Sequence, residues 1–153
     1  MQKFKRPESI LVVVYATDTQ RVLMLLRKDD SSFWQSVSGS LEQDETALQA
    51  AKREVAEELG IIIADQHLNL IDCQRTVDFE IFPQFRHRYK SHVTHCREHW
   101  FLLPLPQEMK VRLTEHSDYC WANAESAVEM TKSWNNALAI KEFLLDKQVV
   151  TEK

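Results

Sequence analysis

The chain has 153 residues and a formal net charge of −4 at pH 7, and 44% of its residues are hydrophobic. This length is typical of one domain with a single core, so we expect one domain over residues 1–153. A net negative charge excludes the basic surface that binding to duplex nucleic acid requires. The start of the chain is polar, and the apolar run at residues 10–16 is too short to cross a membrane. These features predict a cytoplasmic protein that binds neither nucleic acid nor membranes.

The first predicted elements are two β-strands near the N-terminus. Residues 10–16 are continuously apolar and mostly β-branched, as expected of a strand that is covered on both faces. Residues 18–20 provide a turn, and residues 21–27 predict a second strand that pairs with the first as a hairpin. Residues 33–38 are expected to be extended and lead directly into Gly39.

The stretch between Gly39 and Gly60, the only glycines in the sequence, contains the clearest helix signal. Thr46 followed three residues later by Gln49 is a capping-box pattern. Residues 47–59 are rich in good helix formers and contain no proline, and Gly60 suits the left-handed residue that commonly follows a helix. We therefore expect a helix over residues 47–59.

Three glutamates share one side of this predicted helix. Glu54, Glu57 and Glu58 are spaced by three and four residues and occupy an arc of roughly 100°. Arg53, four residues before Glu57, can offset only part of their repulsion. A solvated acidic face is the ordinary explanation of such a pattern. The alternative is a metal site, because Mg²⁺ binds one or two carboxylates together with water and substrate phosphate oxygens.

The spacing of Gly39, Glu45 and the segment REVAEELGI at residues 53–61 resembles the complete Nudix box. The resemblance implies an α/β protein of the α+β type, in which a mixed, curved β-sheet is sandwiched between helices. It also implies a loop–helix–loop that binds Mg²⁺, or Mn²⁺, and hydrolyses a diphosphate linked to another group. Glu54, Glu57 and Glu58 then become metal ligands or the general base, and Arg53 becomes their orienting partner.

The second half of the chain predicts further strands and two more helices. We expect extended segments at 68–73, 77–81 and 119–121, a loop or strand edge at 86–90, and a strand at 97–103 that is ended by Pro104 and Pro106. Short helices are expected at 124–130 and, capped by Ser133, at 134–146. Glu115 falls in the loop before residues 119–121. It can complete the metal site, act as a general base or be an ordinary exposed glutamate.

Segments outside the box resemble the branch of the family that hydrolyses dihydroneopterin triphosphate in folate synthesis, among them residues 70–77, 79–82, 86–89 and 131–134. The resemblance implies release of diphosphate and formation of dihydroneopterin monophosphate. It implies that Lys5 and Arg27 clamp the phosphates and that Ser38 and Ser133 donate hydrogen bonds. The heterocycle would then pack against a wall made of Phe79, Glu80, Ile81 and Phe82. For the two phenylalanines a role in the core is equally compatible with the sequence.

Two other functions remain open at this point. One is another activity of the same family, such as a nucleoside triphosphate diphosphatase that acts on dATP or noncanonical nucleotides. The other is a non-catalytic module that senses a nucleotide-like ligand, although a sensor need not retain all three helix carboxylates. In either enzymatic case we expect a monomer whose partner is a small-molecule triphosphate.

Overall fold

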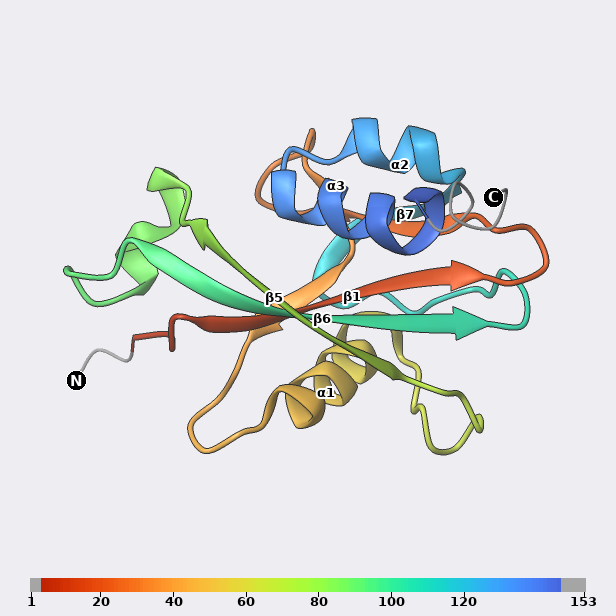
Figure 1. Ribbon diagram of the computed structural model, residues 1–153, viewed down its shortest axis with the longest axis horizontal. Coiled ribbons are helices and arrows are strands. Elements are labelled where there is room, and N and C mark those ends of the chain that lie inside the picture. The colour runs from red at the N-terminus through yellow and green to blue at the C-terminus, as the bar shows by residue number, and fades with distance from the viewer. Residues whose placement is uncertain (1–3, 147–153) are drawn as a thin grey trace.

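The computed structural model describes residues 4–146, and within this range seven strands form one mixed sheet. Helices lie on both sides of the sheet (Figure 1). The strands are β1 (Glu8–Ala16), β2 (Val22–Arg27), β3 (Trp34–Gln35), β4 (Val37–Ser40), β5 (Ile71–Glu80), β6 (His95–Leu105) and β7 (His116–Ala122). The helices are α1 (Ala47–Leu59), α2 (Ala124–Met130) and α3 (Trp134–Ile140), with a 3₁₀ helix at Pro83–Arg88 and a π-helical turn at Lys141–Leu145.

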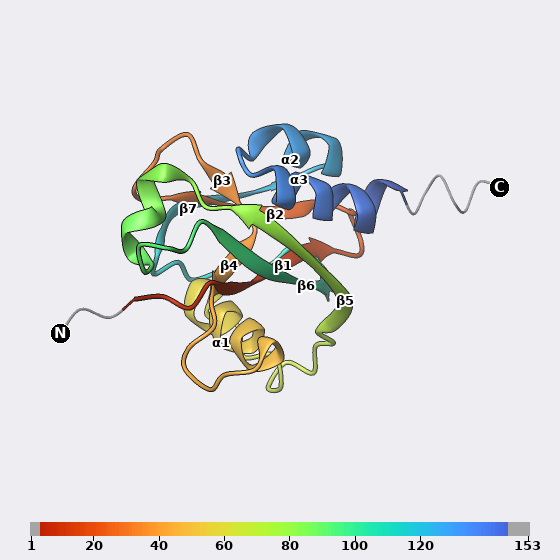
Figure 2. The ribbon, with the colours of Figure 1, turned by 60° about the vertical axis from the view of Figure 1, so that its left-hand side comes forward.

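Strand β1 lies in the middle of the sheet and is buried on both faces, as its continuous apolar sequence predicts. Ile10, Val12 and Val14 belong to the core under α1, whereas Leu11 and Val13 belong to the core under α2 and α3. Figure 2 shows α1 on one face of the sheet and the other two helices on the opposite face. The predicted fold, a mixed and curved sheet between helices, is confirmed.

On one side β1 pairs along its whole length with β6, in parallel. On its other side it changes partner. Residues 9–12 pair with β4, and only Tyr15, near the end of the strand, pairs with Val22 of β2, which confirms the predicted hairpin. Because β2 also carries β3 and β7, the sheet forks along this side of β1, with β4 on one branch and β2, β3 and β7 on the other.

Helix α1 has the predicted bounds and the predicted ends. The Thr46 side chain accepts a hydrogen bond from the backbone N–H of Gln49, and the Gln49 side chain accepts one from the Thr46 N–H. Gly60 follows the helix in the left-handed conformation with φ of 71°. Val55 and Leu59 bury the apolar side of the helix against the sheet. The carboxylates on the other side therefore have a fixed orientation relative to the strands.

The prediction that Pro104 ends its strand was wrong. β6 continues through Pro104 to Leu105, still paired with β1. β5 pairs with β6 only as far as Leu102, so the opposite edge of β6 has no strand partner at position 104. A proline is tolerated there because no partner requires its missing N–H.

The stretch at residues 86–90 was predicted as a loop or strand edge. Its first half instead belongs to the 3₁₀ helix Pro83–Arg88, which starts at the proline as helices often do. The two predicted C-terminal helices are confirmed, and the second ends in the π-helical turn. None of the helices described between residues 4 and 146 is long and apolar enough to span a bilayer.

Candidate active site

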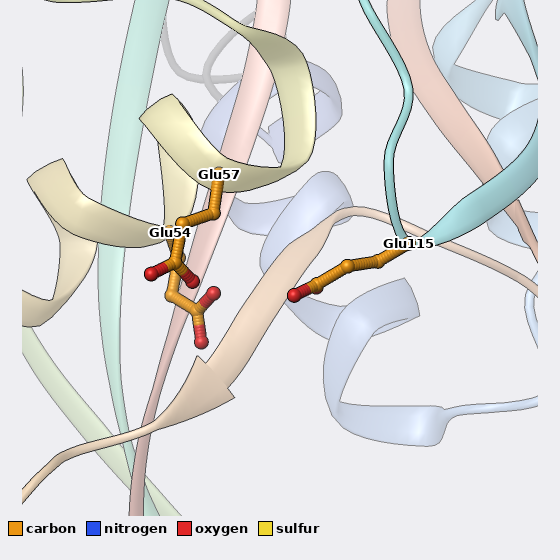
Figure 3. Close-up of side chains that lie close together, drawn as sticks. All are labelled: Glu54, Glu57 and Glu115. Atoms are coloured by element: carbon orange, nitrogen blue, oxygen red, sulfur yellow. The ribbon is translucent and has the colours of Figure 1, made fainter.

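Three carboxylates from two parts of the chain meet beside α1. Glu54 and Glu57 project from the helix and Glu115 projects toward them from the loop before β7 (Figure 3). One oxygen of each lies within 4.8 Å of the others. Glu54 is buried, while Glu57 and Glu115 are exposed. The predicted site residue Glu115, which follows Glu57 by 58 positions and Glu54 by 61, is thus brought to the helix across the fork of the sheet.

Glu58 lies next to this cluster but is completely buried, with 0% of its surface exposed. Within the part of the chain that the structure describes, neither of its carboxylate oxygens has a hydrogen-bond partner of good geometry, although the backbone of Ser38 lies close enough to lower its pKa. The nearest basic group is the imidazole of His116, with Nε2 3.8 Å from Glu58 Oε1. Burial, followed by the positive charges of Arg27 and Lys28, lowers the pKa of His116 to about 4, so this imidazole is neutral near pH 7. His116 therefore supplies no positive charge to Glu58.

The electrostatics of the cluster favour uptake of a cation. Burial raises the pKa of Glu54 to about 7, and the charges of Glu115 and Glu57 add to this while Arg53 opposes it. The pKa of Glu58 is raised by burial and then by the charges of Glu54 and Glu115. Carboxylates that are crowded, buried and unpaired are costly unless a positive charge neutralises them.

Arg53 holds the loop before α1 against the helix. Its guanidinium binds both oxygens of Glu45, at 2.8 and 2.9 Å, and donates to the carbonyl of Ser40 at 3.0 Å. It also donates to Glu57 at 3.2 Å, and one of its nitrogens lies 3.5 Å from Glu54. These contacts suit the orienting role predicted for Arg53. Its positive charge also lowers the pKa of Glu54, against the effect of burial.

Gly39 is required by the position of Glu54. A Cβ atom at Gly39 would overlap with the carboxylate of Glu54. The absence of a side chain on β4 thus creates the space in which this carboxylate lies. Together with the unpartnered oxygens of Glu58, this space makes the residues fit a hard divalent cation, which prefers carboxylate oxygens.

The acidic cluster opens into a cavity of about 1120 Å³. Arg53, Glu54, Glu57 and Glu115 line this cavity, whereas Glu58 lies behind them. All the residues predicted to contact substrate line the same cavity, namely Lys5, Arg27, Ser38, Phe79, Glu80, Ile81, Phe82 and Ser133. The structure therefore gathers the predicted contacts in one place, and their individual roles remain predictions.

One wall of the cavity is cationic and aromatic. The Arg27 guanidinium forms two hydrogen bonds with Asp29, at 2.7 and 2.6 Å, and lies 4.6 Å from the centre of the Phe85 ring. Arg88 contacts the same ring from 4.9 Å. Burial and the charge of Arg88 lower the pKa of Lys5, which also lies close enough to Glu54 to be affected by its charge. Lys5, Arg27 and Arg88 thus lie near one another in the cavity that also contains the acidic cluster.

Sequence reasoning missed a buried carboxylate in the same cavity, Glu98 on β6. Its Oε1 accepts hydrogen bonds from Trp100 Nε1 at 3.0 Å and from Asn135 Nδ2 at 2.7 Å. Burial raises the pKa of Glu98 to about 7, although these two donors oppose the shift. The signal that could have found it is the alternation of β6, in which Glu98 occupies an inward position between Cys96 and Trp100.

Comparison with known proteins defines the class of this one. The NUDIX domain model matches residues 5–144, so the chain belongs to the NUDIX family. Hydrolases of this family depend on divalent cations, and the structure contains an acidic cluster that could hold one. As a member, the chain acts on a small molecule that carries phosphate groups.

Within the family, the chain is similar to proteins of one named activity. It is 57% identical over 143 residues to dihydroneopterin triphosphate diphosphatase of Escherichia coli K12. This match covers 94% of this chain and 95% of that protein. It is 51% identical over 146 residues to the Haemophilus influenzae protein of the same name, covering 95% and 92%. The solved structure of the E. coli dihydroneopterin triphosphate pyrophosphohydrolase superposes with a TM-score of 0.92 at 56% identity, covering 95% of this chain and 99% of that one.

Proposed function

We propose that this protein hydrolyses dihydroneopterin triphosphate to dihydroneopterin monophosphate and diphosphate, with Mg²⁺ as its cation. The observation that carries the proposal is the identity of 57% to the E. coli enzyme along nearly the full length of both chains. The site is compatible with this substrate, since an acidic cluster and a cationic, aromatic wall share one cavity. A substrate with a polyphosphate tail and a flat ring needs both kinds of surface.

In the proposed enzyme, Glu54, Glu57, Glu58 and Glu115 hold the cation. When bound, Mg²⁺ neutralises phosphate charge and lowers the pKa of a coordinated water. Glu57 and Glu115 are the candidates for the general base, because they are the exposed members of the cluster and can meet a water molecule. One of them takes a proton as the water oxygen bonds to phosphorus and the bridging P–O bond breaks.

The remaining predicted contacts bind the two halves of the substrate. Lys5 and Arg27 bind phosphate oxygens, and Ser38 and Ser133 contribute polar contacts to the same molecule. Phe79 and Phe82 pack against the pteridine, with Glu80 and Ile81 between them in the chain. Phe82 is held by other rings, since its centroid lies 5.9 Å from that of Phe33 and 6.2 Å from that of Phe85.

The decisive experiment measures diphosphate release by the purified protein with Mg²⁺. Dihydroneopterin triphosphate is compared with a panel of nucleoside triphosphates, including dATP, and kcat/KM is determined for each. We expect the highest kcat/KM for dihydroneopterin triphosphate. A comparable or higher value for a canonical nucleotide would reject this substrate, and no release from any triphosphate would indicate a sensor.

The proposed enzyme is a cytoplasmic monomer, as the sequence predicts. Size-exclusion chromatography with light scattering measures its mass in solution. A mass near 18.0 kDa is expected for a monomer. Twice that mass would reject this part of the proposal.

A further inference from the structure

Glu98 is a buried carboxylate that the chemistry at the metal cluster does not use. Only 4% of the surface of Glu98 is exposed, and Glu98 lines the cavity. Cys96 and Trp100, two positions before and after it on β6, face the same side of the sheet and are buried. An ionised side chain is rarely kept in such surroundings without partners. Its hydrogen bonds therefore indicate what the position is for.

The two oxygens of Glu98 are used unequally. Oε1 accepts from both Trp100 and Asn135, which occupies its two lone pairs. Among the residues that the structure describes, none donates a hydrogen bond to Oε2. A carboxylate oxygen in a buried position requires donors, and the cavity is the direction from which a ligand can supply them.

Residues from α3 and its N-terminal cap fix this carboxylate in place. Ser133 Oγ donates to Asn135 Oδ1 at 2.5 Å, so the Asn135 amide must present its NH₂ group to Glu98. Ser133 Oγ also accepts the backbone N–H of Asn136, which fixes the start of the helix. The carboxylate is thus held in one orientation before any ligand binds, which reduces the entropic cost of binding.

The sheet places Glu98 at a suitable distance from the metal cluster. In register, Glu98 is beside Ser9 of β1, and Ser9 is beside Ser40 of β4, next to the Gly39 that accommodates Glu54. Two strand spacings, or roughly 10 Å in the plane of the sheet, separate the backbone at Glu98 from this point. Glu98 faces α3, whereas α1 lies on the other face, and the cavity connects the two sides. A triphosphate joined to a ring by a short carbon chain can span this distance. Phe79, paired with Cys96 on the neighbouring strand, supplies apolar surface beside Glu98.

On the basis of the proposed function, we propose that Glu98 is the residue that selects the ring of the substrate. Its Oε2 accepts hydrogen bonds from the adjacent N–H donors of a 2-amino-4-oxopteridine, at the 2-amino group and at N3. Donors that pair with a buried carboxylate form strong, directional hydrogen bonds. The cation and the phosphate clamps then bind the other end of the same molecule, so that ring and tail are recognised separately.

The test uses ring ligands that lack phosphate, so that it is independent of catalysis. 7,8-Dihydroneopterin and its 2-oxo counterpart, in which oxygen replaces the amino group, are titrated against the full-length protein by calorimetry. We expect the wild type to bind the 2-amino compound about 10- to 100-fold more tightly, as for hydrogen bonds to a charged group. Glu98→Gln should lose this preference. Asp78→Asn, an exposed carboxylate on neighbouring β5 that pairs with Arg97, should retain it.

A second titration separates recognition from structure. Diphosphate with Mg²⁺ should bind Glu98→Gln as tightly as it binds the wild type. Equal loss of diphosphate and ring binding would mean that Glu98 only supports the fold, and would overturn the proposal. The proposal would also be overturned if the wild type did not bind the 2-amino compound or did not prefer it. A preference that survives in Glu98→Gln would overturn it as well.

The two proposals fail in different ways. If the wild type does not hydrolyse dihydroneopterin triphosphate but shows a ring preference that depends on Glu98, the proposed reaction is wrong and the role of Glu98 stands. If it hydrolyses this substrate with a ring preference that Glu98→Gln leaves unchanged, the role of Glu98 is wrong and the reaction stands.

Discussion

The cavity contains buried carboxylates in two regions, and burial raises the pKa in both. At the α1 end, Glu54 and Glu58 are crowded by other carboxylates, and the charge of Arg53 and the backbone of Ser38 only oppose the resulting rise in their pKa values. On β6, no neighbouring carboxylate contributes to the raised pKa of Glu98, and Trp100 and Asn135 both donate to one of its oxygens. In the first region repulsion adds to the cost of burial, whereas in the second region donors reduce it.

This difference indicates which ligand each region lacks. A group of carboxylates that repel one another is stabilised by one multivalent cation, which neutralises several of them together. A single carboxylate with one satisfied oxygen is stabilised by N–H donors, which a neutral ring can provide. Similar shifts of pKa therefore correspond to different chemistry, and only the partners of each oxygen distinguish the two cases.

The largest expected effect comes from Glu58→Gln at the crowded end. Removing one carboxylate ligand should lower kcat for diphosphate release by more than about 100-fold, because metal ligation contributes several kcal/mol to the transition state. Without divalent cations, the variant should be at least as stable as the wild type, since a buried unpaired carboxylate is gone. Both are measured on the same preparation, by turnover with saturating Mg²⁺ and by thermal unfolding in EDTA.

Asp78→Asn serves as the control, because Asp78 is exposed and lies on β5, which β6 and β1 separate from β4. Addition of Mg²⁺ at about 100 times its dissociation constant should stabilise this control and the wild type by about 2.7 kcal/mol. Glu58→Gln should gain much less. Full turnover in Glu58→Gln at saturating Mg²⁺ would remove Glu58 from the site.

These two regions also differ in how far the sequence alone predicts them. Helix α1 and its cap at Thr46 were predicted correctly because the signals are local, within one or two turns. The partners of Glu98 are not local, since Asn135 lies 37 positions away and reaches it only through the packing of α3 on the sheet. The path of β6 through Pro104 likewise depends on where β5 stops pairing. Sequence patterns predict elements, whereas these contacts depend on which elements meet.

The two glycines provide a second and smaller contrast. Gly39→Ala places a methyl group in the space of the Glu54 carboxylate, so we expect kcat/KM to fall by about 10- to 100-fold, as for a displaced metal ligand or its support. Gly60→Ala instead strains a left-handed residue with φ of 71°. It should lower the free energy of unfolding by about 1 kcal/mol and leave kcat/KM unchanged. Equal loss of activity in both variants would contradict the role assigned to Gly39.

Glu98→Gln should change how the free energy of unfolding depends on pH. The folded protein holds a proton on Glu98 up to a pKa of about 7, whereas the unfolded chain releases it near the ordinary value of 4.5. The stability from this proton is present below pH 4.5 and is lost as pH rises through 7, by up to about 3 kcal/mol. Relative to the wild type, Glu98→Gln should therefore become more stable as pH increases across this range. Urea unfolding at several pH values measures the difference, and a difference that does not change with pH would refute it.

The smallest effect concerns the cap that positions Asn135. Ser133→Ala removes the acceptor for the Asn136 N–H and should cost about 1 kcal/mol of stability. It should also weaken binding of 7,8-dihydroneopterin several-fold, because the proposed contact of Ser133 with the ligand is lost and Asn135 is free to turn away from Glu98. Asn123→Ala, which removes the corresponding cap of α2 at Ser126, is the matched control. Its loss of stability should be similar, without a change in binding.

The acidic cluster lies where the two branches of the sheet separate beside β1. Glu54 and Glu57 belong to the helix that follows β4, on one branch, whereas Glu115 directly precedes β7, on the other. Their oxygens meet across the gap between the branches, where no strand-to-strand hydrogen bonds hold the described sheet together. A ligand shared by these three side chains is therefore a cross-link between two halves of the sheet. Two hydrogen bonds already join the segment before β7 to the end of α1, from Thr114 Oγ1 to the Glu57 carbonyl and from the Arg112 N–H to the Leu59 carbonyl. A shared ligand therefore reinforces a link that the chain itself makes.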